Sequence, residues 1–351
     1  MDQKETTSGK KRRGRGWLIA LLVIFIVLLC IGLLVYGAIT LKLNSIKRPD
    51  PNETYIGESE WESIVASDEA GNETYESVDP DAVDFASDSI VPIGGTSDLV
   101  NILLIGDDRR PGEDRARSDS IILCSINKKT GKISLVSFLR DLYVQIPDYK
   151  GDSFRDNRIN ASYAFGGMEL LDQTLEKNFG ILIDGNLSID FDGFEKVIDI
   201  LGGVDIDLTQ EEVDYMHMCN RKFVTLGTNH FDGKTALFYA SIRYIGTDFG
   251  RTNRQRTVLN AIFHKLKGSS VSQMLELMDE ILPLMTTDMS NSQIISYIYE
   301  LLPIFNGTEL QTMYIPYADT YSYSMIRGMS VLLPDYAANR KLLQELLLAD
   351  E

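Results

Sequence analysis

The stretch LVNILLIGDDRRPGEDRARSDSIILCSINKKTGKISLVSFLRD, residues 99–141, decides the fold. It contains three short apolar runs, LVNILLIG, SIILCSI and KISLVSFL, which are rich in Ile, Leu and Val and are bounded by polar loops. Such runs predict three strands. The loop from Asn127 to Gly131 has the length and the glycine of a β-hairpin, so the second and third strands are expected to pair antiparallel.

Helical patterns follow these strands along the chain. Five apolar residues recur at helical spacing before Gly180, which predicts an amphipathic helix over 160–179, and the apolar pattern of 191–201 predicts a second one. The alternating run GVDIDL predicts a strand. Further helices are expected over 232–241, 252–267, 271–284, 291–302 and 335–348, with a strand over 310–315. This mixture predicts an α+β or three-layer α/β domain.

Charge divides the chain into three regions. The net charge is +7 for residues 1–49 and −14 for residues 50–98. Because the whole chain has a net charge of −17, residues 99–351 have a net charge of −10. An acidic chain of this kind argues against a duplex nucleic-acid partner, because phosphate contacts need clustered cations. The three cysteines do not have the spacing of metal ligands, and the three histidines are scattered along the chain. The sequence also has no phosphate-binding loop motif, no nucleophile-elbow motif of serine hydrolases and no zinc-binding motif, so these kinds of active site are poorly supported.

The first two regions predict a membrane anchor and a spacer. Residues 17–39 carry no charge and would span about 34 Å as a helix, enough for one transmembrane crossing. The basic tail over 1–16 places the amino terminus in the cytoplasm and the rest outside. A cleaved signal peptide or a buried core helix is the alternative, and the length of the run disfavours both. Residues 40–98 have the composition of an acidic, disordered, extracytoplasmic linker, which leaves 99–351 as the outer domain.

Acidic and basic side chains gather where the predicted strands end. The first strand is followed by Asp107, Asp108 and Arg110. The apolar part of the second strand is preceded by Arg117 and Asp119, and the third strand is followed by Arg140 and Asp141. Mg²⁺ prefers carboxylate oxygens, and guanidinium groups bind phosphate oxygens in pairs. These residues therefore predict a Mg²⁺–phosphate site, with Asp108 and Asp119 on the metal.

A second basic cluster reaches from Arg243 to Arg256. Arg251, Arg254 and Gln255 are three or four residues apart, so one helical turn would place them on one face. A single arginine of this kind is usually a solvated surface cation. Two clusters in a domain of charge −10 favour an anion-binding function instead.

At these residues the chain resembles the LytR-CpsA-Psr family of bacterial cell-wall proteins. Most of 99–265 carries the resemblance, in the segments NILLIGDDRR (101–110), RSDSIIL (117–123), SFLRDLYVQIP (137–147), RINASYAFGG (158–167), DGFEKVIDILGGVDIDL (192–208), GKTALFYASIRY (233–244) and DFGRTNRQRTVLNAI (248–262). The resemblance implies an α/β/α-type domain with a mixed central sheet, flanking helices and a hydrophobic tunnel for a polyprenyl lipid. It also implies a Mg²⁺-dependent, membrane-anchored transferase that moves a glycopolymer, such as teichoic acid or a capsule, from polyprenyl pyrophosphate to a peptidoglycan sugar hydroxyl.

The resemblance also assigns residue roles. Asp108 and Asp119 match the metal ligands, with Asp107 leaving the first ligand ambiguous. Apart from the resemblance, the chemistry needs a carboxylate to assist deprotonation of the acceptor, and Asp119 and Asp141 are both candidates. The pyrophosphate-binding residues are Arg110, Arg117, Arg140, Arg243, Arg251, Arg254 and Gln255. Ser241 stands where many relatives carry an arginine. A Mg²⁺-dependent pyrophosphatase and a non-catalytic polyprenyl-phosphate-binding protein remain the alternative functions.

Overall fold

The computed structural model describes residues 37–51, 53, 55–57, 59, 61–62, 75–86, 90–107, 118–267, 271–305 and 310–348. The chain divides into two units, Met1–Ser45 and Ile46–Glu351. The predicted membrane span lies almost wholly outside the described residues. Within the described part of the chain, no helix is both long and apolar enough to cross a membrane.

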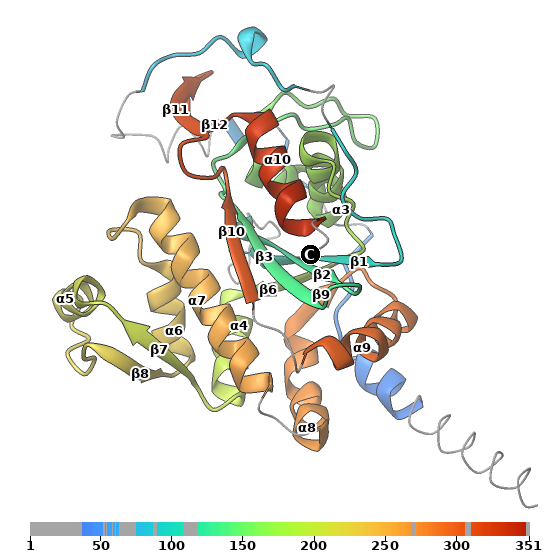
Figure 1. The fold of residues 1–351 in the computed structure, drawn as a ribbon, viewed down its shortest axis with the longest axis vertical. Coiled ribbons are helices and arrows are strands. Elements are labelled where there is room, and N and C mark those ends of the chain that lie inside the picture. Colours follow the sequence, from blue (N-terminus) through green and yellow to red (C-terminus); the bar gives the residue numbers. More distant parts are fainter. Residues whose placement is uncertain are drawn as a thin grey trace, which may run out of the picture. The chain divides into compact units, whose positions relative to one another are not determined.

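A six-stranded mixed sheet forms the centre of the second unit (Figure 1). Its strands, in spatial order, are β10 (Leu310–Ile315), β3 (Lys132–Phe138), β2 (Ser118–Asn127), β1 (Leu99–Asp107), β6 (Gly185–Asp190) and β9 (Met285–Thr287). The three apolar runs of the sequence become β1, β2 and β3. The antiparallel pairing of β2 with β3 is as predicted, and β1 also pairs antiparallel with β2. By contrast, β6 runs parallel to β1 and β10 parallel to β3, so the sheet is mixed.

Helices cover both faces of this sheet, which gives the predicted three layers. On one face lie α3 (Ile159–Phe179) and α10 (Tyr336–Leu347), and on the other α4 (Phe191–Ile200), α6 (Gly233–Ser241) and α7 (Thr247–Lys267) (Figure 1). The alternation of β1 shows the division. Leu103 and Ile105 belong to the core cluster that contains α3, whereas Leu104 and Gly106 line a cavity under α4, α6 and α7.

Smaller elements complete the unit. The hairpin of β7 (Val204–Leu208) and β8 (Gly227–Phe231) packs with α5 (Gln210–Met218) around a second apolar cluster. The others are η1 (Pro80–Ala82), β4 (Tyr143–Val144), β5 (Asn157–Arg158), α8 (Val271–Ile281), η3 (Leu282–Leu284), α9 (Asn291–Phe305), β11 (Tyr321–Ile326) and β12 (Met329–Pro334). The sequence predicted α8, α9 and α10 but not α5, β11 or β12.

The segment before β1 is more ordered than its composition predicts. Trp61 is 2% exposed, its Nε1 donates a hydrogen bond to Asn157 Oδ1 at 3.1 Å, and its ring packs edge-on against Phe165. Farther along, the backbone of Ile93 bonds to Gly180 and Leu182. The prediction of a disordered linker over 40–98 is therefore wrong for these described parts. Composition averages over a segment, and a few anchoring side chains are enough to order it.

Candidate active site

Arg140 lies at the centre of a network of ion pairs at one end of the sheet. Its Nη1 is 3.1 Å from Asp119 Oδ1, and its Nε is 3.4 Å from Asp141 Oδ2 and 3.9 Å from Asp248 Oδ2. Three further arginines contact these carboxylates: Arg243 with Asp119 at 3.8 Å, Arg251 with Asp248 at 3.3 Å and Arg158 with Asp141 at 3.5 Å. We call these seven residues the charge cluster.

Strand and helix ends bring the charge cluster together. Asp119 is the second residue of β2, and Arg140 and Asp141 follow the end of β3, which pairs with β2 along its length. Asp248 and Arg251 lie in the first turns of α7. Side chains at such ends project beyond the packed layers, where a ligand can reach them.

The arginines hold Asp119 in its ionised form. Burial alone would raise its pKa, but the positive charges of Arg140, Arg251 and Arg243 outweigh burial and lower the pKa below the ordinary value. Two adjacent carboxyls behave differently from each other. Burial raises the pKa of Asp248, with Asp141 adding to the effect, whereas Arg140 and Arg158 overcome burial at Asp141 and lower its pKa. The pair Asp141–Asp248 is thus suited to share one proton.

Arg251 has hydrogen-bonding capacity to spare. The residue is 4% exposed, yet its Nε and Nη1 have no hydrogen-bond partner among the described residues. Burial lowers its pKa in spite of the pairing with Asp248. A buried guanidinium with open donors is costly unless an anion completes it, so the charge cluster has the donor chemistry of a phosphate site.

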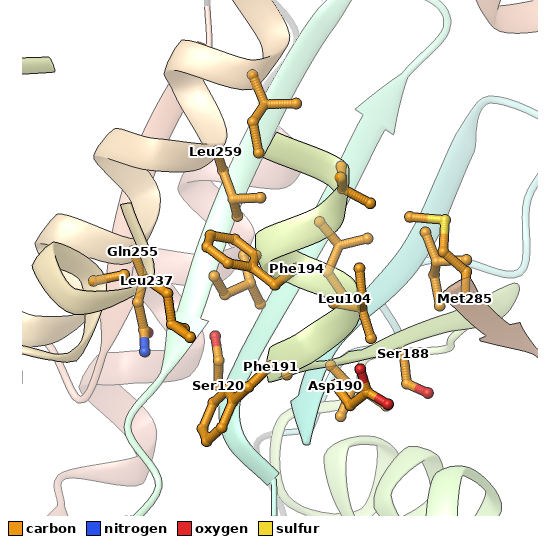
Figure 2. A pocket seen from close by; sticks show the side chains of 18 of the residues that line it. Leu104, Ser120, Ser188, Asp190, Phe191, Phe194, Leu237, Gln255, Leu259 and Met285 are labelled. Atoms are coloured by element: carbon orange, nitrogen blue, oxygen red, sulfur yellow. The ribbon is translucent and has the colours of Figure 1, made fainter. Parts of the chain in front are cut away.

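An apolar cavity of ≈ 220 Å³ opens beside the charge cluster (Figure 2). The strands β1, β2 and β6 form its floor and α4, α6 and α7 its walls, with Leu104, Ile122, Leu187, Phe191, Phe194, Val197, Leu237, Leu259, Ile262 and Met285 among the lining side chains. Figure 2 shows the polar side chains of Ser120, Asp190 and Gln255 gathered toward one end of the cavity, near Phe191. Gln255 lies one helical turn after Arg251 on α7, and Ser241, which also lines the cavity, lies two residues before Arg243, so this polar end adjoins the charge cluster.

The cavity distinguishes the two amphipathic helices that the sequence predicts over 160–179 and 191–201. Phe191, Phe194 and Val197 do line the cavity, but Ala164, Met168, Leu171, Leu175 and Phe179 all belong to the packed core on the opposite face.

The predicted site residues divide into three groups. Asp119, Arg140, Asp141, Arg243 and Arg251 come together in the charge cluster, and Gln255 lines the cavity. Asp108, Arg110 and Arg117 lie outside the described residues. Arg254 points elsewhere: its Nη2 donates to the carbonyls of Ile242 and Ile245 at 2.5 and 2.8 Å, and its Nη1 is 3.7 Å from Glu212. These contacts hold the loop after α6.

Two members of the charge cluster, Arg158 and Asp248, were not singled out from the sequence. Both stand inside motifs that the sequence analysis quoted, RINASYAFGG and DFGRTNRQRTVLNAI. The predicted helices begin at residues 160 and 252, after both side chains, so only their place inside these motifs signalled a role.

The metal assignment concerns Asp108, which lies outside the described residues, and Asp119. Among the described residues, no three His, Cys, Asp or Glu side chains are grouped as a metal site would require. Of the two predicted ligands, Asp119 is described, and its ionised carboxylate has the oxygen chemistry that Mg²⁺ prefers.

Comparison with known proteins gives a consistent result. The sequence model of the LytR_cpsA_psr family matches residues 63–346. The polyisoprenyl-teichoic acid–peptidoglycan teichoic acid transferase TagU of Bacillus mycoides is 36% identical over 180 residues, which are 51% of this chain and 55% of the relative. The TagU of Bacillus cereus is 37% identical over 172 residues, 48% of this chain and 53% of that protein. The chain thus spans about half the length of the curated relatives it matches.

Solved structures share the fold. TagT bound to LIIa-WTA superposes with a TM-score of 0.58 at 25% identity, covering 72% of this chain and 92% of TagT. TagV of Bacillus subtilis gives a TM-score of 0.57 at 28% identity and covers 73% of this chain and 100% of TagV. The mixed sheet with helices on both faces is therefore the architecture of these proteins as well.

Proposed function

The chain belongs to the LytR-CpsA-Psr family, and we propose that it transfers a glycopolymer from polyprenyl pyrophosphate to a peptidoglycan sugar hydroxyl. One observation carries the proposal: an apolar cavity adjoins a buried arginine whose donors are open. An apolar chain fits the cavity, and a diphosphate fits the guanidinium groups. The names of the TagU relatives, and the LIIa-WTA bound to TagT, support the same activity for this chain.

The charge cluster supplies the chemistry. A pyrophosphate linkage is already activated, so catalysis consists mainly of positioning and charge neutralisation. The acceptor oxygen forms a bond to the phosphorus that bears the glycan, and the bond from that phosphorus to the polyprenyl phosphate oxygen breaks. Arg140, Arg251 and Arg243 neutralise the charge on the diphosphate and on the departing polyprenyl phosphate.

The acceptor proton goes to the pair Asp141–Asp248. Asp248 is the better base of these carboxyls, because burial and the neighbouring Asp141 raise its pKa, whereas guanidinium contacts lower the pKa of both Asp119 and Asp141. Sequence alone left Asp119 and Asp141 as equal candidates, and the structure adds Asp248 beside Asp141.

We also propose that Asp119 and Asp108 would hold Mg²⁺ and that Arg110 and Arg117 would bind the phosphates. Bound there, the ion would neutralise part of the diphosphate charge. Support comes from the ionised state of Asp119 and from the position of Asp108 one residue after the end of β1.

A single assay separates this function from its rivals. The full chain, in detergent, is incubated with a polyprenyl-pyrophosphate glycan labelled in the sugar, with and without peptidoglycan and Mg²⁺. Transfer of label to peptidoglycan is the expected result. Release of a soluble glycan phosphate without an acceptor would indicate a pyrophosphatase, and retention of the intact lipid a binding protein.

The proposed reaction requires the outer domain to face the peptidoglycan. We propose that residues 1–16 are cytoplasmic, that 17–39 cross the membrane and that the remainder is extracytoplasmic. A reporter that is active only outside the membrane, fused after Glu351, should give a signal. A signal from a cytoplasm-specific reporter would contradict this topology.

A further inference from the structure

A second pocket, of ≈ 350 Å³, is lined in part by members of the charge cluster and shares no lining residue with the apolar cavity. Asp141, Arg243 and Asp248 form its polar part, and the rings of Tyr75, Phe249 and Tyr323 form much of its wall. Its chemistry is unlike that of the first cavity, which is lined almost entirely by aliphatic and phenyl groups. We call it the aromatic pocket.

The aromatic wall is held rigidly. Tyr75 stacks on Tyr323 with ring centroids 5.1 Å apart, and Tyr321 packs edge-on against Tyr323 at 5.6 Å and stacks on Phe249 at 5.1 Å. Tyr75 belongs to the segment before β1, and its neighbours in that segment, Glu76 and Val78, bond to the backbone of Met325 in β11. Rings fixed in this way offer flat contact area at little cost in conformational entropy.

Resting on the proposed function, we infer that the aromatic pocket binds the acceptor sugar of peptidoglycan. A sugar has an apolar face of C–H groups that packs on aromatic rings, and hydroxyls that donate to carboxylates such as Asp141 and Asp248. The pocket offers both kinds of surface within one wall.

The direction of the reaction gives an independent argument. Displacement at phosphorus places the attacking and leaving oxygens roughly in line. The polyprenyl phosphate leaves toward the apolar cavity, next to Asp119 and Ser120, so the acceptor hydroxyl must arrive from the opposite side of Arg140. Arg140 contacts Asp119 through Nη1 but Asp141 and Asp248 through Nε, and these last two carboxylates line the aromatic pocket.

The test uses the full chain in detergent and the variants Tyr323→Ala and Tyr75→Ala. Tyr323 is 41% exposed on a hairpin, so its loss should leave the fold intact. In the transfer assay, each variant should raise the KM for the peptidoglycan acceptor about five- to tenfold, with the KM for the lipid donor unchanged. Tyr323→Phe, which keeps the ring, should restore the KM. The matched control is Tyr299→Ala, an 83% exposed tyrosine on α9 outside both pockets.

Direct binding keeps the inference separate from the proposed function. A soluble peptidoglycan oligosaccharide, titrated without donor and followed by calorimetry, should bind the wild type and the Tyr299→Ala variant about equally and Tyr323→Ala about five- to tenfold more weakly. This result would stand even if the wild type transferred nothing. Equal binding by all variants would overturn the inference, as would a rise in the donor KM alone, which would assign the pocket to the glycan of the donor.

Discussion

The two faces of the central sheet use the same strands for different purposes. Along β1, Leu103 and Ile105 are 0% and 2% exposed and pack under α3, while Leu104 between them lines the cavity under α4, α6 and α7. A filled face contributes stability, whereas an unfilled one gives up contacts that its lining residues would otherwise make. The face under α7 is thus the less densely packed of the two and has room for a ligand.

Two buried arginines, one on each face of the sheet, also differ in how completely the protein satisfies them. Arg340 of α10 is 2% exposed and donates to the backbone carbonyls of Asn178, Phe85 and Ala86, so it fastens the segment before β1 to the packed face. Arg251 of α7 is 4% exposed and keeps two nitrogens without partners among the described residues. One arginine is completed by the protein itself, and the other is completed by an anion under our account.

The largest effect on transfer activity is expected from a substitution in the charge cluster. Asp119→Asn removes the negative charge that Arg140 and Arg243 contact and that the proposed Mg²⁺ needs, so transfer should fall about a thousandfold. Asp205→Asn, which removes an exposed carboxylate on β7, is the matched control and should transfer normally. Wild-type rates for Asp119→Asn would show that the charge cluster is not the reaction centre.

The packed face should dominate stability. Leu171→Ala, on α3, empties part of the core and should reduce the free energy of unfolding by about 3 kcal/mol. Leu104→Ala makes the same truncation on the cavity side and should reduce it by about 1 kcal/mol or less, because fewer contacts are lost. Denaturant titration of both variants measures the difference. Equal losses would mean that the two faces are packed alike.

The packed side should also respond to pH through Asp172 of α3. Burial raises the pKa of this carboxyl to about 8, with Asp288 and Glu169 adding to the effect, although Asn186 donates a hydrogen bond to it at 2.7 Å. The folded state therefore keeps a proton that the unfolded chain releases near pH 4, and the free energy of unfolding should fall as pH rises toward 8. We expect a loss of about 1–2 kcal/mol from pH 6 to pH 8. Asp172→Asn should flatten this slope, and an unchanged slope would assign it to other groups.

The smallest effect is expected at the polar end of the cavity. Ser241 lines the cavity and is exposed, and only Ile242 separates it from Arg243. Ser241→Arg should tighten binding of polyprenyl pyrophosphate about two- to fivefold, since an exposed ionic contact contributes less than about 1 kcal/mol. Ser241→Gln, of similar reach but without charge, should leave binding unchanged. Weaker binding by the arginine variant would place the diphosphate elsewhere.

The sequence predicts the structure of the packed face more completely than that of the face with the cavity. The runs that became β1, β2 and β3, and the apolar periodicity of α3, specify local structure directly, because burial on one face imposes a spacing. The carboxylates and arginines at strand ends were also predictable, since polar residues there have no structural need. For Arg254, helical spacing predicted which residues share a face but not the contacts with Ile242, Ile245 and Glu212.

Other features depend on long-range contacts that no local pattern encodes. Trp61 is anchored by Asn157, almost a hundred residues away in the chain, and Tyr75 by Tyr323. The cavity is likewise a relation among three strands and three helices, and its lining residues are the same apolar types that fill a core. Only the assembled structure separates the residues of α4 that line a space from those of α3 that fill one.

The central claim is that the open face binds a polyprenyl chain, and filling the cavity tests it most directly. Leu104→Trp would place an indole in the space of ≈ 220 Å³ without touching the charge cluster. Binding of polyprenyl pyrophosphate to the full chain would be measured by calorimetry, beside that of inorganic pyrophosphate. We predict that Leu104→Trp weakens lipid binding at least about tenfold, while the melting temperature and pyrophosphate binding stay at wild-type values. Undiminished lipid binding by a folded Leu104→Trp chain would contradict the account.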